Sequence, residues 1–134
     1  MFDKLFGRGK PRILIADDDD ALCSLLVNLL SGQGYEVAAA RDGMEAIRLL
    51  KKENFDLLIL DVHMPRMAGP EALDVIRLMP NCKDLGVLMM TIEGSMQTFI
   101  NVFEKGATDF LPKPFSPAQI IEKVQAFFAK KKLP

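Results

Sequence analysis

Residues 13–20 read Ile-Leu-Ile-Ala-Asp-Asp-Asp-Asp, a short apolar run that ends in four carboxylates. The run contains β-branched residues and follows Pro11, which is typical of a buried strand. Leucines then recur at helical spacing, at Leu22, Leu25, Leu26, Leu29 and Leu30. Asp20 is expected to cap this helix, with Asp19 also suited to capping, and Gly32 and Gly34 are expected to end it. The pattern predicts a strand followed directly by a helix.

The same alternation continues along the chain. Apolar runs predict four more strands, at residues 35–40, 55–60, 86–90 and 110–111. Apolar stripes at helical spacing predict four more helices, which begin near Asp42, Pro70, Ser95 and Ser116. Pro80 should stop the second of these, and Ser116 should form a capping box with Gln119. Five largely apolar strands alternating with five helices favour an α/β fold, with one parallel sheet covered on both faces.

The connections restrict the order of the strands. Right-handed crossovers leave few arrangements, and the order 2-1-3-4-5 places the strands at residues 13–16 and 55–60 side by side. In a doubly wound sheet of this kind the site lies at the carboxyl ends of the strands, where the strand order reverses. Functional side chains are therefore expected just after each strand.

Composition excludes several classes of function. The 134 residues carry 17 Lys+Arg and 18 Asp+Glu, so the formal net charge is −1, which gives no electrostatic indication of direct nucleic-acid binding. The uncharged stretch at residues 85–92 is far shorter than the roughly 20 apolar residues that cross a bilayer, so no membrane span is expected. Met1 to Lys10 lacks a secretory signal, and the isolated Cys23 and Cys82 suit buried thiols in a reducing compartment. We expect a cytoplasmic protein.

Polar residues follow four of the predicted strands. They are Asp17 and Asp18, Asp61, Thr91 and Lys113. Three carboxylates at adjacent strand ends repel one another unless a cation compensates them, and hard oxygen ligands suit Mg²⁺. Asp61 is the best candidate for a nucleophile that accepts a phosphoryl group, while the metal and Lys113 neutralise the transferring oxygens. Thr91 is placed to donate its hydroxyl to the same group.

Four motifs, in this order, resemble the response-regulator receiver domain of two-component signalling. They are ILIADD at 13–18, DVHMPRMAG at 61–69, TIE at 91–93 and KPF at 113–115. The resemblance covers residues 11–129, between expected tails at 1–10 and 130–134. It implies a flavodoxin-like, doubly wound sheet of five parallel strands in the order 2-1-3-4-5, so the topology expected above is not independent of it.

The resemblance also implies a role for each matching residue. Asp61 matches the phosphoacceptor, which takes its phosphoryl group from a histidine of a sensor kinase or a phosphotransfer protein. Asp18 matches a direct ligand of Mg²⁺, Asp17 a ligand through water, and His63 a ligand through its backbone carbonyl. Lys113 matches the lysine that pairs first with the acceptor and then with the phosphoryl group.

Further matches concern the switch. Thr91 and Phe110 match the two residues that change position together and bias the face formed by the fourth helix, the fifth strand and the fifth helix. An unknown downstream effector protein would read that face. The bond between Lys113 and Pro114 is often cis in the family. The chain is thus expected to be a signalling switch, not an enzyme, and to catalyse only its own phosphorylation and dephosphorylation.

Some positions depart from the family pattern or vary within it. Ile92 stands where the family usually has a small residue, and its bulk could narrow the path to Asp61. Ala68 replaces a polar residue, which removes a local cap. His63 and Glu93 occupy positions that tune dephosphorylation, in a direction that the sequence does not give.

Two other functions stay open at this point. Asp17-Asp18-Asp19 also satisfies the DxD pattern of haloacid-dehalogenase-type phosphohydrolases, with Asp17 as nucleophile and Asp19 as acid/base. Enzymes of this type have longer chains, with a cap or further strands, and this chain has little beyond its five strand–helix units. The other alternative is a receiver-like docking scaffold that phosphate does not regulate. The presence of all the chemical residues counts against it, and Ile92 keeps it open.

Overall fold

The structure, a computed structural model, describes residues 9–92 and 94–132. Its strands are β1 (Arg12–Ala16), β2 (Glu36–Ala40), β3 (Leu57–Asp61), β4 (Gly86–Thr91) and β5 (Asp109–Pro112). Its helices are α2 (Asp20–Gly32), α3 (Gly43–Lys52), α4 (Gly69–Ile76), α5 (Met96–Glu104) and α6 (Pro117–Lys132), with a short 3₁₀ helix η1 (Pro80–Cys82) after α4.

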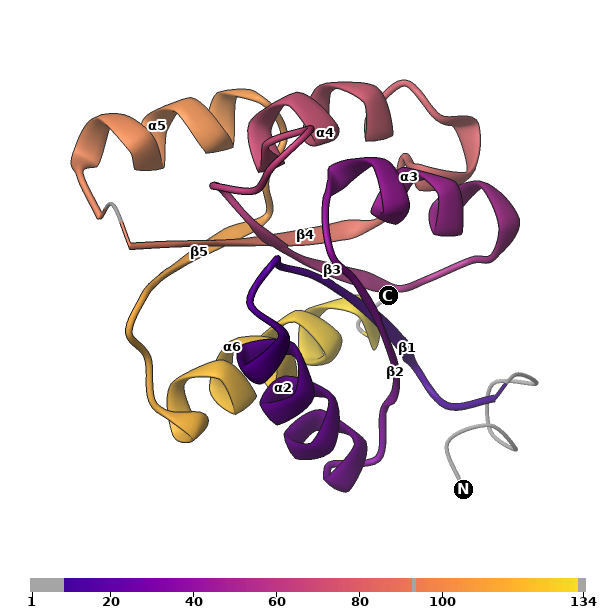
Figure 1. The fold of residues 1–134 in the computed structure, drawn as a ribbon. Helices are drawn as coiled ribbons and strands as arrows, with labels where there is room; N and C mark the ends of the chain where they lie inside the picture. The colour runs from indigo at the N-terminus through magenta and orange to yellow at the C-terminus, as the bar shows by residue number, and fades with distance from the viewer. Residues whose placement is uncertain (1–8, 93, 133–134) are drawn as a thin grey trace.

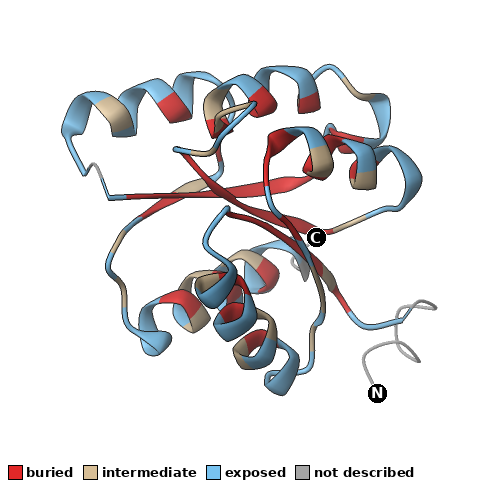
Figure 2. Cartoon of the chain, in the orientation of Figure 1, coloured by how far each residue is buried: buried red, intermediate tan, exposed pale blue. Residues whose placement is uncertain are grey.

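The five strands form one parallel sheet in the order β2-β1-β3-β4-β5. Helices α2 and α6 cover one face of the sheet, and α3, α4 and α5 cover the other (Figure 1). The predicted α/β class, strand order and doubly wound arrangement are confirmed. Because both faces are covered, the sheet is largely buried (Figure 2), and the central strand β3 is buried along its whole length.

Successive strand residues alternate between two hydrophobic cores, because their side chains point to opposite faces of the sheet. Leu14 and Leu58 pack in the core beneath α3, α4 and α5. Ile13 and Ile59 pack in the core beneath α2 and α6. Cys23 and Cys82 are buried free thiols, one in each core, as the sequence predicted.

Two helix ends differ from the prediction. Asp19, not Asp20, caps α2, because its Oδ1 accepts the backbone N–H of Leu22 at 3.1 Å and Asp20 already lies inside the first turn. Helix α4 ends at Ile76, before Pro80, which begins η1 instead. After Ile76 the backbone hydrogen bonds span three residues, as in a 3₁₀ helix: the N–H of Met79 donates to the Ile76 carbonyl at 3.0 Å.

Other expected caps are confirmed. Asp42 and Ser95 cap α3 and α5. The capping box of α6 is complete: the Ser116 N–H donates to Gln119 Oε1 at 2.7 Å, and the Gln119 N–H donates to Ser116 Oγ at 3.2 Å. Helix α6 continues to Lys132, past residue 129 where the domain was expected to end. Residues 1–8 of the expected N-terminal tail lie outside the described residues.

Within the described ranges, no helix has the length and hydrophobicity that a membrane crossing requires.

Candidate functional site

Three carboxylates gather at the carboxyl edge of the sheet. Asp17 and Asp18 follow β1 and Asp61 ends β3, and these two strands are paired. One oxygen from each carboxylate lies within 4.8 Å of the other two. Asp17 and Asp61 are buried, whereas Asp18 is exposed. The cluster, defined by Asp17, Asp18 and Asp61, therefore faces solvent on the side of Asp18.

Lys113 brings a positive charge to this cluster from the far end of the chain. It follows β5, and its backbone N–H donates to the Thr91 carbonyl at 2.6 Å. Its Nζ lies 3.3 Å from Asp61 Oδ1, which is the pairing that the resemblance implies, but the shorter contact, 2.7 Å, is with Asp17 Oδ2. The bond from Lys113 to Pro114 is cis, as the resemblance also implies.

The surroundings of Asp61 oppose its ionisation. Burial, together with the charge of Asp17, raises the pKa of Asp61 to about 6, and Lys113 offsets this only in part. Burial also works against the Lys113 ammonium, but its contacts with Asp17 and Asp61 prevail and raise its pKa. The site thus holds more negative than positive charge, which favours the binding of a cation.

The donor set fits Mg²⁺. Mg²⁺ binds hard oxygen ligands, usually one or two carboxylates together with waters and phosphate oxygens. The clustered carboxylates supply such oxygens, and exposed Asp18 leaves a side open for water. The side chain of His63 is exposed, and the ligand expected from this residue is its backbone carbonyl.

The chain after Asp61 turns back so sharply that only glycine fits at residue 69. The Gly69 N–H donates to the Val62 carbonyl at 3.0 Å. A Cβ on Gly69 would lie 2.2 Å from the backbone oxygen of Asp61. This steric requirement was missed from the sequence, where Gly69 was only part of a motif. Ala68 caps α4 without a side-chain hydrogen bond, so the expected loss of a cap is present.

The residues expected to act as a switch lie on β4 and β5, the two strands beyond β3 in the sheet. Thr91 ends β4, which pairs with β3, and is fully buried. Phe110 on β5 is 5% exposed, and its ring meets that of Phe99 edge-on at 5.3 Å between centroids. Phe99 on α5 is exposed, so it links the buried Phe110 to the surface. No pattern in the sequence distinguishes Phe99 from the other apolar residues of this helix as the contact of Phe110.

Ile92 follows Thr91 and is 77% exposed. Together with Lys113 and Pro114 it lines a hollow of about 380 Å³. None of the three clustered carboxylates lines this hollow, so the expected narrowing of the path to Asp61 stays a prediction. Glu93, the neighbouring position expected to tune dephosphorylation, lies outside the described residues.

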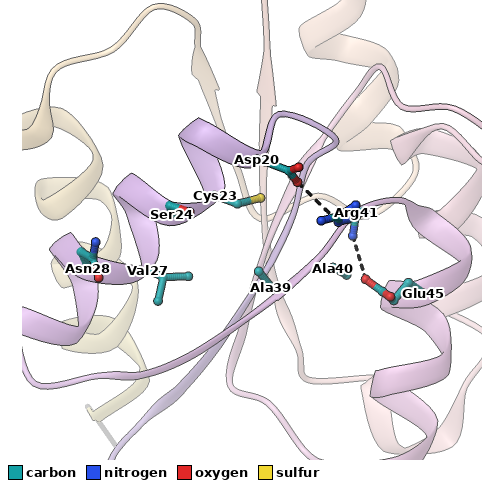
Figure 3. A pocket seen from close by; sticks show the side chains of 9 residues that line it. All are labelled: Asp20, Cys23, Ser24, Val27, Asn28, Ala39, Ala40, Arg41 and Glu45. Atoms are coloured by element: carbon teal, nitrogen blue, oxygen red, sulfur yellow. Dashed lines mark hydrogen bonds and ion pairs between the residues drawn. The ribbon is translucent and has the colours of Figure 1, made fainter.

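A second hollow, of about 470 Å³, opens beside the edge strand β2 (Figure 3). Arg41 on its rim pairs with Asp20 at 3.4 Å and donates its backbone N–H to Glu45 at 2.9 Å. These charged groups are bonded to one another, and the lining of the hollow includes none of Asp17, Asp18, Asp61 and Lys113. We assign it no part in the site.

Comparison with known proteins identifies the family. The sequence model of one protein family, the response regulator receiver domain, matches residues 13–125. The chain is 37% identical over 122 residues to the response regulator MprA of Mycobacterium ulcerans, which covers 91% of the chain and 52% of MprA. It is also 37% identical over 119 residues to the transcriptional regulatory protein CpxR of Escherichia coli K12, covering 89% of the chain and 50% of CpxR.

Solved structures agree. The chemotaxis protein CheY4 of Vibrio cholerae superposes with a TM-score of 0.86 at 34% identity, covering 89% of this chain and 99% of CheY4. The receiver domain of the Francisella response regulator 1452 superposes with a TM-score of 0.84 at 29% identity, covering 91% of this chain and 99% of that domain.

The chain belongs to the response regulator receiver domain family, whose members are signalling domains of two-component systems and not classical enzymes. It spans about half the length of the curated relatives it matches. The family match sets aside the phosphohydrolase alternative. Asp19, the acid/base of that alternative, is engaged as the cap of α2.

Proposed function

We propose that Asp61 accepts a phosphoryl group from a histidine of a sensor kinase or a phosphotransfer protein, and that this modification switches the domain. The observation that carries the proposal is the surroundings of Asp61. This buried carboxylate lies at the carboxyl end of the central strand β3, clusters with Asp17 and Asp18, and has Lys113 Nζ at 3.3 Å. A pKa of about 6 leaves most Asp61 side chains ionised, and so nucleophilic, at neutral pH.

The transfer forms one bond and breaks another. An oxygen of Asp61 attacks phosphorus, the new O–P bond forms as the P–N bond of the phosphohistidine breaks, and the imidazole leaves with the bonding electrons. Lys113 stabilises the charge on the transferring oxygens, and Asp17 orients Lys113 through the 2.7 Å contact. Mg²⁺, held by Asp17, Asp18, Asp61 and the carbonyl of His63, would neutralise phosphoryl oxygens in the same way.

Thr91 and Phe110 relay the change in this proposal. The Thr91 hydroxyl would turn toward the phosphoryl group, and Phe110 would move with it. Phe110 contacts Phe99 of α5, so the shift would reach the face formed by α5, β5 and α6, which is the output face expected from the sequence. An effector protein would bind that face in one state more tightly than in the other.

The remaining expectations stay predictions. They are a receiver module at residues 11–129 between short tails, a cytoplasmic location, no direct binding of nucleic acid, and slow hydrolysis of the phosphoryl group by the domain itself.

Binding of beryllofluoride, a mimic of the phosphoryl group, tests the pocket directly by fluorine NMR. We expect a bound resonance that requires Mg²⁺ and is absent in Asp61→Asn. Asp84→Asn removes an exposed carboxylate outside the cluster and should bind normally. Equal binding by Asp61→Asn, or no binding by the wild-type chain with Mg²⁺, would contradict the proposal.

A further inference from the structure

Arg66 lies in the loop between β3 and α4, the acceptor loop (residues 62–68), and has an unusual backbone conformation. In the described part of the chain it is the one non-glycine residue with positive φ, at 64°. This left-handed region is unfavourable for residues with a Cβ, and such residues persist there only when the surroundings hold them.

An ion pair with Asp42 holds Arg66. The guanidinium is bonded to Asp42 Oδ2, while Asp42 Oδ1 accepts the N–H of Glu45 at 2.9 Å as the cap of α3. The Asp42 side chain is 2% exposed and that of Arg66 is 71% exposed, so the arginine reaches in from the surface to a buried carboxylate. The pKa of Asp42 is lowered, mainly because its carboxylate accepts the N–H of Glu45. Burial works in the opposite direction, but Arg66 lowers the pKa further, so Asp42 stays charged.

The ion pair is part of a tight contact between the acceptor loop and the start of α3. A Cβ on Gly43 would lie 2.7 Å from the backbone oxygen of Met67, so the two backbones touch. Within the loop, the Met67 N–H donates to the Pro65 carbonyl at 2.7 Å. The loop that begins directly after Asp61 is thus fastened to α3 at its far end, where Arg66 lies.

We propose that Arg66 is a positioning residue for the phosphoacceptor site: its ion pair with Asp42 holds the acceptor loop in the left-handed turn and so fixes the backbone beside Asp61. The inference rests on the proposed function of Asp61. Arg66 acts through the loop, which also carries His63, the expected backbone ligand, two residues after Asp61. Loss of the ion pair should therefore weaken Mg²⁺ binding and slow phosphoryl transfer together.

Mg²⁺ titration by calorimetry, on the full chain, tests this with four single variants and one double variant. Arg66→Ala should raise the half-saturating Mg²⁺ concentration roughly two- to fivefold, the range expected from losing a partly exposed ion pair. Arg66→Lys keeps the charge and should restore most of the affinity. Arg66→Gly should fall between, because glycine adopts positive φ without strain. Asp42→Asn keeps a capping oxygen but loses the charge, so it should match Arg66→Ala, and the double variant Arg66→Ala/Asp42→Asn should be no worse than either.

Lys123→Ala is the matched control. It breaks an ion pair with Asp109, 3.0 Å long and also partly exposed, far along the chain from the acceptor loop. It should leave Mg²⁺ binding and the rate of phosphorylation by acetyl phosphate unchanged.

Wild-type Mg²⁺ affinity in Arg66→Ala, or a defect that Arg66→Lys does not relieve, would overturn the inference. A wild-type chain that binds Mg²⁺ but is never phosphorylated would contradict only the proposed function, since the metal titrations still compare the Arg66 variants.

Discussion

At the scale of single residues, Asp61 is a carboxylate whose charge the fold disfavours. The pKa of Asp61 rises from an ordinary value of 3.8 to about 6 on folding, because burial and Asp17 both oppose its charge. Since the folded protein binds this proton more tightly than the unfolded chain does, stability falls as the pH rises from about 4 to about 6. The same proton competes with any cation for the site, so Mg²⁺ affinity should fall as the pH drops below about 6.

Asp61→Asn should therefore stabilise the Mg²⁺-free protein. At neutral pH we expect a gain on the order of 1–3 kcal/mol, because the amide removes an unfavourable buried charge. The gain should shrink as the pH falls from about 6 and approach zero below about pH 4, where the wild-type carboxylate becomes protonated in both states. Urea unfolding at a series of pH values measures this, and a gain that does not change with pH would contradict it.

Lys113→Ala should destabilise the protein. It leaves the clustered carboxylates without the ammonium that pairs with Asp17 and Asp61, and we expect a loss of about 2–4 kcal/mol at neutral pH without Mg²⁺. Saturating Mg²⁺ should restore part of that loss by replacing the missing charge. Thermal and urea unfolding with and without Mg²⁺ measure both effects. A loss that Mg²⁺ leaves untouched would mean that the carboxylates do not share a cation site.

Ile92 should slow phosphorylation by small donors. Its exposed side chain lines the same hollow as Lys113, whose Nζ lies 3.3 Å from Asp61. Ile92→Ala should be labelled severalfold faster by acetyl phosphate, whereas Leu78→Ala, which trims an exposed leucine after α4, should not differ from wild type. An ordinary rate that is unchanged in Ile92→Ala would end this explanation.

At the scale of elements, helix α4 starts directly against the acceptor. Gly69→Ala would place a Cβ 2.2 Å from the Asp61 backbone oxygen, so either β3 or α4 must move. We expect a loss of roughly 2 kcal/mol or more in unfolding free energy, with slower labelling of Asp61. Gly32→Ala, at the end of α2 where a Cβ meets nothing within 4 Å, should change stability by no more than about 1 kcal/mol. Equal effects of the two substitutions would show that the close approach at Gly69 does not constrain the site.

The ends of elements were the least predictable features. Four consecutive aspartates all suit a helix cap by type, and only the direction of the backbone selects Asp19 over Asp20. Likewise Pro80 indicates that a helix must stop, but it does not show that the backbone of α4 tightens several residues earlier. The capping box at Ser116 and Gln119 was predictable because both partners lie within one turn.

At the scale of the whole molecule, the sheet was predictable because its central strands are apolar on both faces. Residues 57–60 have no polar member, and such a strand is stable only between two layers of helices. The position of the acidic cluster followed from the topology, since parallel strands bring their carboxyl ends to one edge. The link between Arg66 and Asp42 was not predictable, because neither the sign of φ nor a contact across 24 residues leaves a local pattern. For the same reason the shorter contact of Lys113 with Asp17 emerged only from the structure.

Intact-mass spectrometry after incubation with Mg²⁺ and a phosphodonor, followed by mapping of the modified residue, tests the central claim most directly. Acetyl phosphate and a panel of purified histidine kinases should each be used as donors. The wild-type chain should gain the mass of one phosphoryl group on Asp61, and Asp61→Asn should gain none. A label on another residue, or a chain that no donor labels although it binds Mg²⁺, would contradict the claim and leave a docking scaffold that phosphate does not regulate.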